Sequence, residues 1–530
     1  MQQEKKKFQP WLPLLFSLVL VAGILIGYQL RENTGQRFFQ AGNRAPLQEV
    51  IDLIRMKYVD SVNTDTLADI AIHDILLKLD PHSIYIPPVE LPEMNEDLQG
   101  NFQGVGVEFH IFQDTVNVVS VLEKGPSEKA GLQVGDQFIK VGDSVVAGNK
   151  ITGNRIKNML RGPGSSKIEV TILRNGKPMK FTIPRGIIPI PSVDAAYMID
   201  QQTGFIRINK FSETTYEEFM QGLEDLQQKG MKQLILDLRG NGGGILSEAV
   251  DIADEFLDED KLIVFTKGSH VPVINYECKR PGLFEQGKLT VLIDESSASA
   301  SEILTGALQD WDRATIIGRR SFGKGLVQEQ YTLNDGAALR LTVARYYTPS
   351  GRSIQKPYTG NDHYSNDIIE RYEHGELVNA DSNKIMNGKA FKTSKGRTVY
   401  GSGGIMPDVF VPFDTSTLSS TLADLYTSNT MSNFVYRYYI EHKSEFKTYN
   451  SAITFAENFS NEELVWNELV SFAASDSLNL GTLAPKEKLL AQRRLKALLA
   501  RLPWRANGFY QVLNMKDVTV QKALEVMNGK

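Results

Sequence analysis

The sequence predicts a multi-domain α/β protein, and three observations support this prediction. The chain has 530 residues, which is more than one hydrophobic core usually holds. Between Phe205 and Gly318, short apolar runs typical of strands alternate with helical patterns. A separate stretch of short β-rich runs, divided by glycines, extends from Gly104 to Ile183. Helical patterns precede and follow these two regions.

The composition excludes several functions. With a formal net charge of -5 the chain has no basic surface for a phosphate backbone, so nucleic acid is not an expected partner. The single cysteine, Cys278, excludes a disulfide framework and a cysteine-based zinc site. The seven histidines are scattered and form no H-E-x-x-H pair. We therefore expect neither a metal ion nor another cofactor.

The N-terminus contains the only signal for location. Lys5–Lys7 precede an uncharged run from Trp11 to Leu30. At about 1.5 Å per residue this run can cross a hydrocarbon core of ~30 Å. The lysines favour a cytoplasmic N-terminus, so we expect a single-pass inner-membrane anchor with the rest of the chain on the periplasmic side. A cleaved signal peptide is the alternative.

Apolar positions at helical spacing predict helices between Pro46 and Asp80. Four prolines then interrupt the pattern: Pro81, Pro87, Pro88 and Pro92. In the β-rich stretch the predicted strands are Gly106–Phe109, Val116–Val121, Gln137–Val141, Ile168–Leu173 and Met179–Ile183. One helix interrupts them, with an apolar stripe of Ile151, Ile156, Met159 and Leu160.

This β-rich stretch resembles a PDZ domain. The motifs that carry the resemblance are Gly104-Val105-Gly106-Val107, Gly125-Pro126-Ser127, Ala130-Gly131-Leu132, Gly135-Asp136 and Arg161-Gly162-Pro163-Gly164. In PDZ domains the amides of a glycine-containing loop bind a terminal carboxylate, and an open strand edge pairs with the peptide. The resemblance implies that Gly104, Val105, Gly106 and Val107 form that loop. The alternative is that the glycines only permit a tight turn.

The alternating region predicts strands at Phe205–Asn209, Leu234–Leu238, Leu289–Ile293 and Thr315–Gly318, and helices at Tyr216–Gln228, Ile245–Leu257 and Ser301–Trp311. Ligands of such α/β layers bind at the carboxyl ends of the strands. Two distinctive segments lie at such ends. Asp237–Gly244 includes three consecutive glycines, and Asp294–Glu302 contains Ser296, Ser297, Ser299 and Ser301.

The glycines of the first segment can turn backbone amides inward, which suits an oxyanion hole or a phosphate. No G-x-x-x-x-G-K-[ST] motif is present, so nucleotide binding is disfavoured. A simple connecting turn is a further alternative. Serines at a helix start are usually caps, and a lysine such as Lys324 is usually a solvated loop residue. The residue types alone therefore leave the chemistry open.

A dense set of motifs resembles the carboxyl-terminal processing (tail-specific) proteases. It includes Ser299-Ala300-Ser301-Glu302, Phe322-Gly323-Lys324-Gly325, Gln328, Leu341–Tyr346 and Gly403–Val409, and it covers roughly Pro46 to Pro412. The resemblance implies that Ser299 is the nucleophile, Lys324 the general base and Gln328 the residue that orients the lysine. It also implies oxyanion donors at Ala300 and at Gly243 or Gly244, of which we favour Gly244.

This chemistry requires Lys324 to be uncharged at neutral pH. A base must be neutral, so its pKa of ~10.4 has to fall by about two to three units, and burial is the expected cause. Formal S-x-x-K matches begin at Ser321, Ser353 and Ser444. Ser321 is the strongest rival nucleophile, because it would share Lys324.

The predicted domains are a stub and anchor (1–30), a helical region (31–96), a PDZ domain (97–186), a protease domain (187–412) and a helical appendage (413–530). We expect a serine endopeptidase that binds the C-termini of exported or membrane-associated polypeptides through its PDZ domain and cleaves nearby. A homo-oligomer and a PDZ gate over the active site are open possibilities. The alternative function is a catalytically silent PDZ scaffold.

Overall fold

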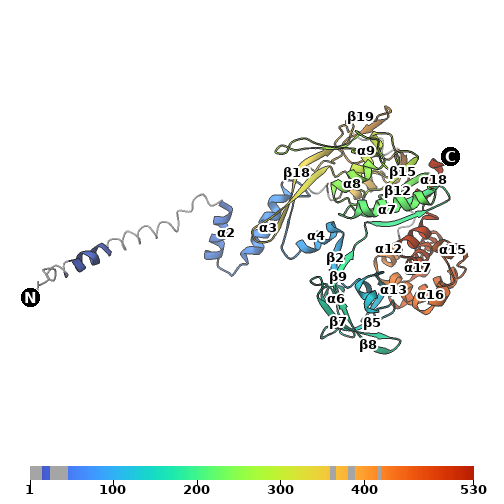
Figure 1. The fold of residues 1–530 in the computed structure, drawn as a ribbon, viewed down its shortest axis with the longest axis horizontal. Coiled ribbons are helices and arrows are strands. Elements are labelled where there is room, and N and C mark those ends of the chain that lie inside the picture. Colours follow the sequence, from blue (N-terminus) through green and yellow to red (C-terminus); the bar gives the residue numbers. More distant parts are fainter. Residues whose placement is uncertain are drawn as a thin grey trace, which may run out of the picture. The chain divides into compact units, whose positions relative to one another are not determined.

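The computed structural model describes residues 13, 15–23, 46–358, 364, 366–379, 388–414 and 419–529 (Figure 1). The chain forms two compact units, one that ends at Leu79 and one that begins at Asp80. Within the described ranges, no helix is both long and apolar enough to span a bilayer. Of the expected anchor Trp11–Leu30, only residues 13 and 15–23 are described, and they are helical. The other residues of the anchor lie outside the described residues.

The first unit contains the helices α2 (Pro46–Lys57) and α3 (Thr64–Leu77). Asn63 caps α3, because its side chain accepts hydrogen bonds from the amides of Asp65 and Thr66. The helices predicted for this stretch are therefore confirmed.

The second unit is built around a six-stranded sheet with the order β10-β11-β12-β15-β16-β21. β10 (Val193–Met198) is antiparallel to β11 (Thr203–Ile208), and all other neighbours are parallel. The remaining strands are β12 (Gln233–Asp237), β15 (Lys288–Ile293), β16 (Thr315–Gly318) and β21 (Val409–Phe410). Because β12 and β15 are adjacent and parallel, the two loops that follow them lie at the same edge of the sheet.

Helices cover both faces of this sheet. On one face, α7 (Thr215–Gln228), α8 (Leu246–Asp254) and α9 (Ala300–Asp310) share a core with Leu234 and Leu236 of β12 (Figure 1). The intervening Ile235 faces the other side, where α18 (Val518–Met527) covers it. Burial on both faces explains why these strands are continuous apolar runs. The predicted strands and helices of this region are confirmed.

A second sheet lies beside this core and carries the segment that follows Lys324. Its order is β1 (Ile84–Ile86), β18 (Ala338–Tyr347), β13 (Leu262–Lys267) and β14 (Ile274–Glu277), and β17 (Leu326–Thr332) pairs with β18. The sequence did not predict the β17–β18 hairpin. The reason is that β17 is exposed from Glu329 onward, so it lacks a strong apolar pattern.

The PDZ domain is a sheet with the order β3-β4-β5-β7-β8, in which β6 (Ser144–Val145) pairs with β5. Its strands are β3 (Val107–Phe112), β4 (Thr115–Val121), β5 (Gln137–Val141), β7 (Lys167–Arg174) and β8 (Lys177–Pro184). The helices α5 (Pro126–Ala130) and α6 (Gly153–Leu160) complete it. The strand β3, predicted to end at Phe109, continues to Phe112 and forms one edge of the sheet.

A short pair of strands lies between the predicted PDZ domain and the six-stranded sheet. β2 (Asn101–Gly104) runs antiparallel to β9 (Gly186–Pro189). The helix α4 (Leu91–Gln99) precedes β2. The four prolines follow the end of α3 at Leu77, as predicted, but Pro92 does not stop a new helix from starting. Pro92 lies in the first turn of α4, where a missing amide proton costs no hydrogen bond.

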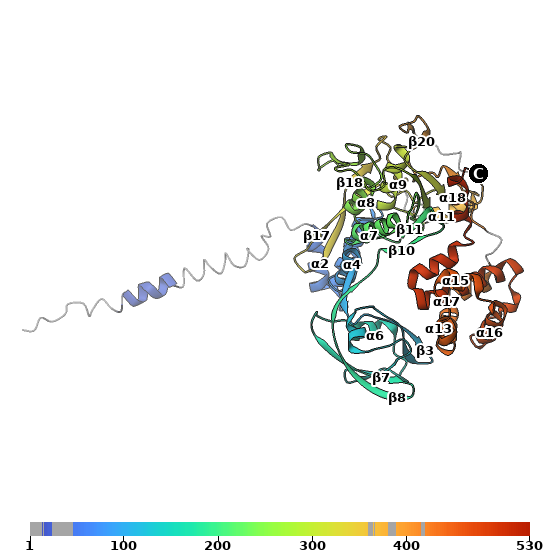
Figure 2. The same cartoon turned by 45° about the vertical axis from the view of Figure 1, so that its right-hand side comes forward.

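The C-terminal region is helical, as the sequence predicted (Figure 2). Its helices are α12 (Ser420–Thr427), α13 (Thr430–Glu441), α14 (Lys443–Phe446), α15 (Ala452–Asn458), α16 (Glu462–Ser475), α17 (Pro485–Asn514) and α18. Leu495 and Leu499 of α17 are buried in the core of this bundle, whereas Leu489 is exposed. α17 is kinked at Trp504 and Arg505, directly after Pro503.

Candidate active site

Ser299 lies where β15 leads into α9, at the N-terminal cap position of the helix. Its backbone has φ 55° and ψ -114°, a conformation that residues other than glycine rarely adopt. Its hydroxyl makes no cap hydrogen bond. The neighbouring hydroxyls are already engaged, because Ser297 donates to Leu238 O at 2.8 Å and Ser301 donates to Asn241 O at 2.9 Å. Strain of this kind persists only where surrounding contacts impose it, and it is typical of functional positions.

The carboxylate of Glu302 joins the Ser299 segment to the Lys324 segment. Its Oε2 accepts from the amide of Ser299 at 2.9 Å and from the amide of Lys324 at 2.8 Å. Its Oε1 accepts from Ser321 Oγ at 2.5 Å and from the Gly323 amide at 2.7 Å. Burial raises the pKa of Glu302 to about 7, although these donors favour the ionised form. From the sequence, Glu302 was only part of the motif Ser299-Ala300-Ser301-Glu302, with no role of its own.

Tyr346 of β18 links the same two segments through their carbonyl groups. Its hydroxyl lies 2.6 Å from Lys324 O and 3.1 Å from Ser299 O, so its single proton is shared between two acceptors. The side chain is only 1% exposed. The backbones of the predicted nucleophile and the predicted base are thus held together on both their amide and their carbonyl sides.

The ammonium group of Lys324 is partly buried and faces Gln328 of β17. Its Nζ lies 3.2 Å from Gln328 Oε1. Burial lowers the pKa of Lys324 below the usual 10.5, Arg340 lowers it further, and Glu302 and Asp80 oppose the shift. This direction agrees with the sequence prediction. Among the described residues no direct hydrogen bond joins Ser299 Oγ to Lys324 Nζ, and such bonds often tighten only when substrate binds.

The segment Asp80–Ser83 also reaches this site, and the sequence analysis missed it. Gln328 Nε2 donates to the carbonyl of His82, which leaves the amide oxygen of Gln328 directed at Lys324. Asp80 holds the turn by accepting from the amides of His82 at 2.8 Å and Ser83 at 2.9 Å. Burial, followed by the charge of Lys324, lowers the pKa of His82 to about 4. The only sequence signal was a polar cluster beside Pro81, which is also typical of a turn.

The glycine loop after β12 lies against Ser299. A Cβ placed on Gly243 would come within 2.7 Å of Ser299 Cβ and 2.9 Å of Ala300 N. The amide of Gly243 donates to Asn241 Oδ1 at 2.8 Å, so it is already engaged. Within the described ranges, the amides of Gly244 and Ala300 have no backbone hydrogen-bond partner. Backbone amides without a partner, next to a nucleophile, are the kind of donors that stabilise an oxyanion, and the Ala300 amide directly follows Ser299 in the chain.

In the PDZ domain, the chain passes from Gly104 at the end of β2 through the buried Val105 and Gly106 to Val107 at the start of the edge strand β3, and Gly106 has φ 75°. Over the described part of the chain, the amides of Val105 and Gly106 have no backbone hydrogen-bond partner. Unpaired buried amides beside an open strand edge are the arrangement that binds a peptide carboxylate.

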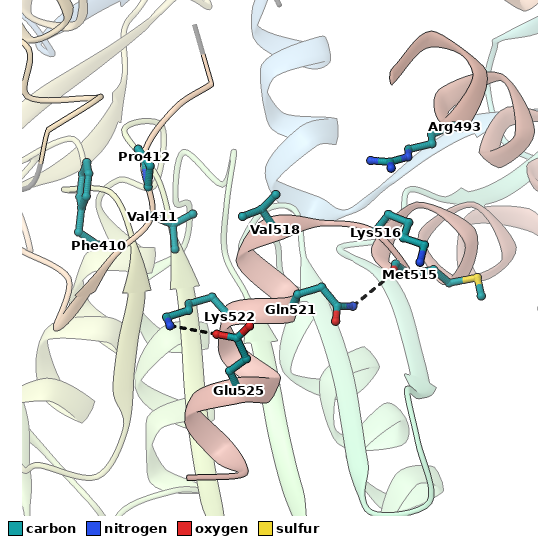
Figure 3. A pocket seen from close by; sticks show the side chains of 10 residues that line it. All are labelled: Phe410, Val411, Pro412, Arg493, Met515, Lys516, Val518, Gln521, Lys522 and Glu525. Atoms are coloured by element: carbon teal, nitrogen blue, oxygen red, sulfur yellow. Dashed lines mark hydrogen bonds and ion pairs between the residues drawn. The ribbon is translucent and has the colours of Figure 1, made fainter. Parts of the chain in front are cut away.

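Open pockets also lie away from these residues. A pocket of about 520 Å³ between β21 and α18 is lined by Val411, Arg493, Lys516 and Val518, among others, and contains none of the residues above (Figure 3). No group of three or more metal-ligating side chains occurs among the residues that the structure describes.

Comparison with known proteins identifies the domains. Residues 202–364 match Peptidase family S41, and residues 118–174 match the PDZ domain family. Residues 421–505 match a family of unknown function, DUF8443. A multi-domain α/β chain with this core is a serine peptidase, a hydrolase of peptide bonds. The chain belongs to the carboxy-terminal processing protease family.

Two curated relatives support this assignment. The carboxy-terminal-processing protease of Bartonella bacilliformis is 36% identical over 338 residues, which are 63% of this chain and 76% of that protein. A probable CtpA-like serine protease of Staphylococcus haemolyticus is 31% identical over 356 residues, 66% of this chain and 71% of that protein.

Two solved structures are also similar. The photosystem II D1 C-terminal processing protease is 27% identical, with a TM-score of 0.35, and the match covers 68% of this chain and 86% of that one. The PDZ domain of the carboxy-terminal protease from Vibrio cholerae in complex with peptide is 25% identical, with a TM-score of 0.16. That match covers 17% of this chain and 97% of the PDZ chain.

Proposed function

We propose that this protease cleaves polypeptides near their C-termini with a Ser-Lys dyad, in which Ser299 is the nucleophile and Lys324 the general base. The observation that carries the proposal is the shared carboxylate oxygen of Glu302, which accepts from the amides of both residues. A hydroxyl becomes a useful nucleophile when a neutral base beside it takes its proton. Burial favours the neutral form of Lys324.

In the proposed reaction, neutral Lys324 accepts the proton of Ser299 Oγ while that oxygen attacks the carbonyl carbon of the substrate. The amides of Ala300 and Gly244 stabilise the resulting oxyanion, since the Gly243 amide already donates to Asn241. The Lys324 ammonium then protonates the leaving amine, and an acyl-enzyme remains on Ser299. Water, deprotonated by Lys324, releases the second product and restores the hydroxyl. Gln328 orients Lys324 throughout.

The PDZ domain supplies selectivity in this proposal. The free amides of Val105 and Gly106 bind the terminal carboxylate, and the free edge of β3 pairs with the preceding residues of the substrate. Loop amides select for a chain end rather than for one sequence. The substrate class is therefore polypeptides with accessible C-termini.

We further propose that an N-terminal helix at Trp11–Leu30 anchors the enzyme in the inner membrane, with its catalytic part on the periplasmic side. Support comes only from the uncharged run and the preceding Lys5–Lys7. Exported and membrane-associated polypeptides are then the accessible substrates. Carbonate extraction and protease accessibility of the full-length chain test this part.

The decisive test is cleavage of casein by the purified chain, with Ser299→Ala as the matched control. We expect fragments from the wild type and none from the variant. Equal cleavage by both proteins would contradict the assignment of Ser299. A folded wild type that binds C-terminal peptides and cuts nothing would instead support the silent scaffold.

A further inference from the structure

The C-terminal helical region (residues 419–529) contacts both the PDZ domain and the six-stranded sheet, and α17 contributes to both sets of contacts. Pro503 has no amide proton, and the helical backbone is interrupted at Trp504 and Arg505. Arg505 has φ 58° and ψ -155°. A residue other than glycine keeps such a conformation only where its contacts impose it. The contacts of Arg505 therefore indicate the role of the kink.

At the kink, Arg505 binds the PDZ domain. Its guanidinium donates to Val121 O at 2.7 Å and to Ser120 Oγ. In the β3–β4 ladder, Val121 pairs with Val107 and Ser120 pairs with Glu108. Arg505 thus holds the strand pair at the end where the loop Gly104–Val107 enters β3.

Further along, the same helix binds the catalytic sheet. Asn507 Oδ1 accepts from the Ala196 amide of β10 at 2.9 Å, and Asn514 donates to Tyr197 Oη at 2.9 Å. The part of α17 after the kink also packs into the bundle core that it shares with α13 and α15. The segment after the kink is thus fixed to β10 at two points.

The connection ends at the glycine loop beside Ser299. Asp517, the N-cap residue of α18, accepts from Arg239 Nη1 at 3.0 Å through both carboxylate oxygens. Arg239 also donates to the fully buried Asp237 at 2.7 Å and 2.9 Å. Arg239 directly precedes Gly240–Gly244, so its position determines where that loop starts.

We infer that the C-terminal helical region is a positioning element that couples the PDZ domain to the glycine loop Gly240–Gly244, here called the oxyanion loop. Arg505 and Asp517 are its positioning residues. A peptide that displaces β3 and β4 must move Arg505, and α17 passes this movement to Asp517 and Arg239. The inference rests on the proposed function, because it requires that the PDZ domain binds substrate.

The test compares full-length variants on one peptide with a free C-terminal carboxylate and on the same peptide amidated. Arg505→Ala is expected to reduce the preference for the free carboxylate about tenfold. Asp517→Asn keeps the N-cap but loses the ion pair, so it is expected to lower kcat for both peptides with KM unchanged. Arg501→Ala is the control, because its ion pair with Glu108 is 4.0 Å long and more than half exposed, so it should change neither value. An unchanged preference in folded Arg505→Ala, or an equal loss in Arg501→Ala, would overturn the inference.

Hydrogen exchange separates this inference from the proposed function. In the Ser299→Ala chain, the free-carboxylate peptide should slow exchange at both 104–107 and 240–244. Adding Arg505→Lys, which keeps the charge but loses the forked donor, should remove the protection at 240–244 only. Protection at 240–244 that survives Arg505→Lys contradicts the coupling alone. No protection at 104–107 in the Ser299→Ala chain contradicts PDZ recognition itself, and the coupling with it.

Discussion

The amides of Ser299 and Lys324 donate to the same oxygen atom, Oε2 of Glu302, at 2.9 Å and 2.8 Å. The two residues come from different loops, one before α9 and one before β17. A shared acceptor fixes the distance between their backbones more firmly than separate contacts would. The buried Tyr346 hydroxyl adds a second link through their carbonyl groups. The geometry of the candidate dyad therefore depends on residues that do not themselves react.

The identity of the nucleophile can be decided with two alanine variants. Ser299→Ala is expected to reduce peptide cleavage by at least about 10³-fold without loss of stability, because its hydroxyl makes no cap bond. Ser321→Ala should remain active but unfold at a lower temperature. Its hydroxyl donates to Glu302 and accepts from the Ile405 amide at 2.6 Å, so its loss leaves buried groups unpaired. Cleavage rates and thermal melts of both variants check this, and a reversed pattern would make Ser321 the nucleophile.

The pH dependence of cleavage should report Lys324. Because only the neutral amine accepts a proton, kcat/KM should rise with pH and level off above the pKa of Lys324, which burial holds below 10.5. Lys324→Ala is expected to lower kcat by about 10²–10⁴-fold and to abolish this rise. A variant that keeps the wild-type profile would exclude Lys324 as the base.

Gln328→Glu tests the orienting residue with almost no change in shape. A carboxylate at 3.2 Å from Lys324 Nζ would favour the ammonium form and raise the pKa of Lys324. We expect reduced activity at neutral pH that recovers as the pH is raised, with the midpoint of the profile displaced by at least about one unit. Gln328→Ala is the control, since it removes the contact without adding a charge. Identical profiles for the two variants would show that Gln328 does not act on Lys324.

Glu302→Gln should damage both the site and its stability. All four hydrogen-bond partners of the carboxylate donate to it, so an NH₂ group would face two donors. We expect a loss of about 1–3 kcal/mol in the free energy of unfolding and a marked fall in kcat.

The pH dependence of stability gives a second readout for Glu302. Burial raises its pKa from 4.5 to about 7, so between these values the folded state binds more protons than the unfolded state. Its contribution to stability is therefore full below 4.5 and is lost as the pH rises through about 7. Denaturant titrations across this range should show that Glu302→Gln lacks the decline. A parallel decline in both proteins would assign it to other groups.

Gly243 and its neighbour Gly242 provide a test variant and a matched control variant in the oxyanion loop. Gly243→Ala would place a methyl group 2.6 Å from Ala298 O and 2.9 Å from Ala300 N, and these are backbone atoms that cannot move aside. We expect kcat to fall by about 10²-fold or more, as when one oxyanion donor is lost. Gly242→Ala is the control, because no atom of the described residues lies within 4 Å of the added carbon. Equal activity of the two variants would contradict a role for this loop.

The sequence anticipated the parts of the fold that local patterns encode. Buried parallel strands such as Gln233–Asp237 are short apolar runs, and α9 begins close to where the pattern placed it. The PDZ loop was recognisable because its glycines carry a conformational requirement, and Gly106 indeed has φ 75°. The hairpin of β17 and β18 was missed, since the exposed end of β17 carries no apolar alternation.

By itself, the sequence determined the class of enzyme, the alternation of strands and helices, and the positions of Ser299 and Lys324 within recognisable motifs. Only the tertiary structure decided that Glu302 and Tyr346 hold those two residues and that the His82 carbonyl holds Gln328. It also decided that Arg505 contacts the PDZ domain while Asp517 contacts Arg239 beside the glycine loop. The physical reason is separation along the chain. Periodicity and turn chemistry act over a few residues, whereas Gln328 meets His82 across 246 positions and Arg239 meets Asp517 across 278. Such contacts exist only after packing of the sheets has chosen which loops come together.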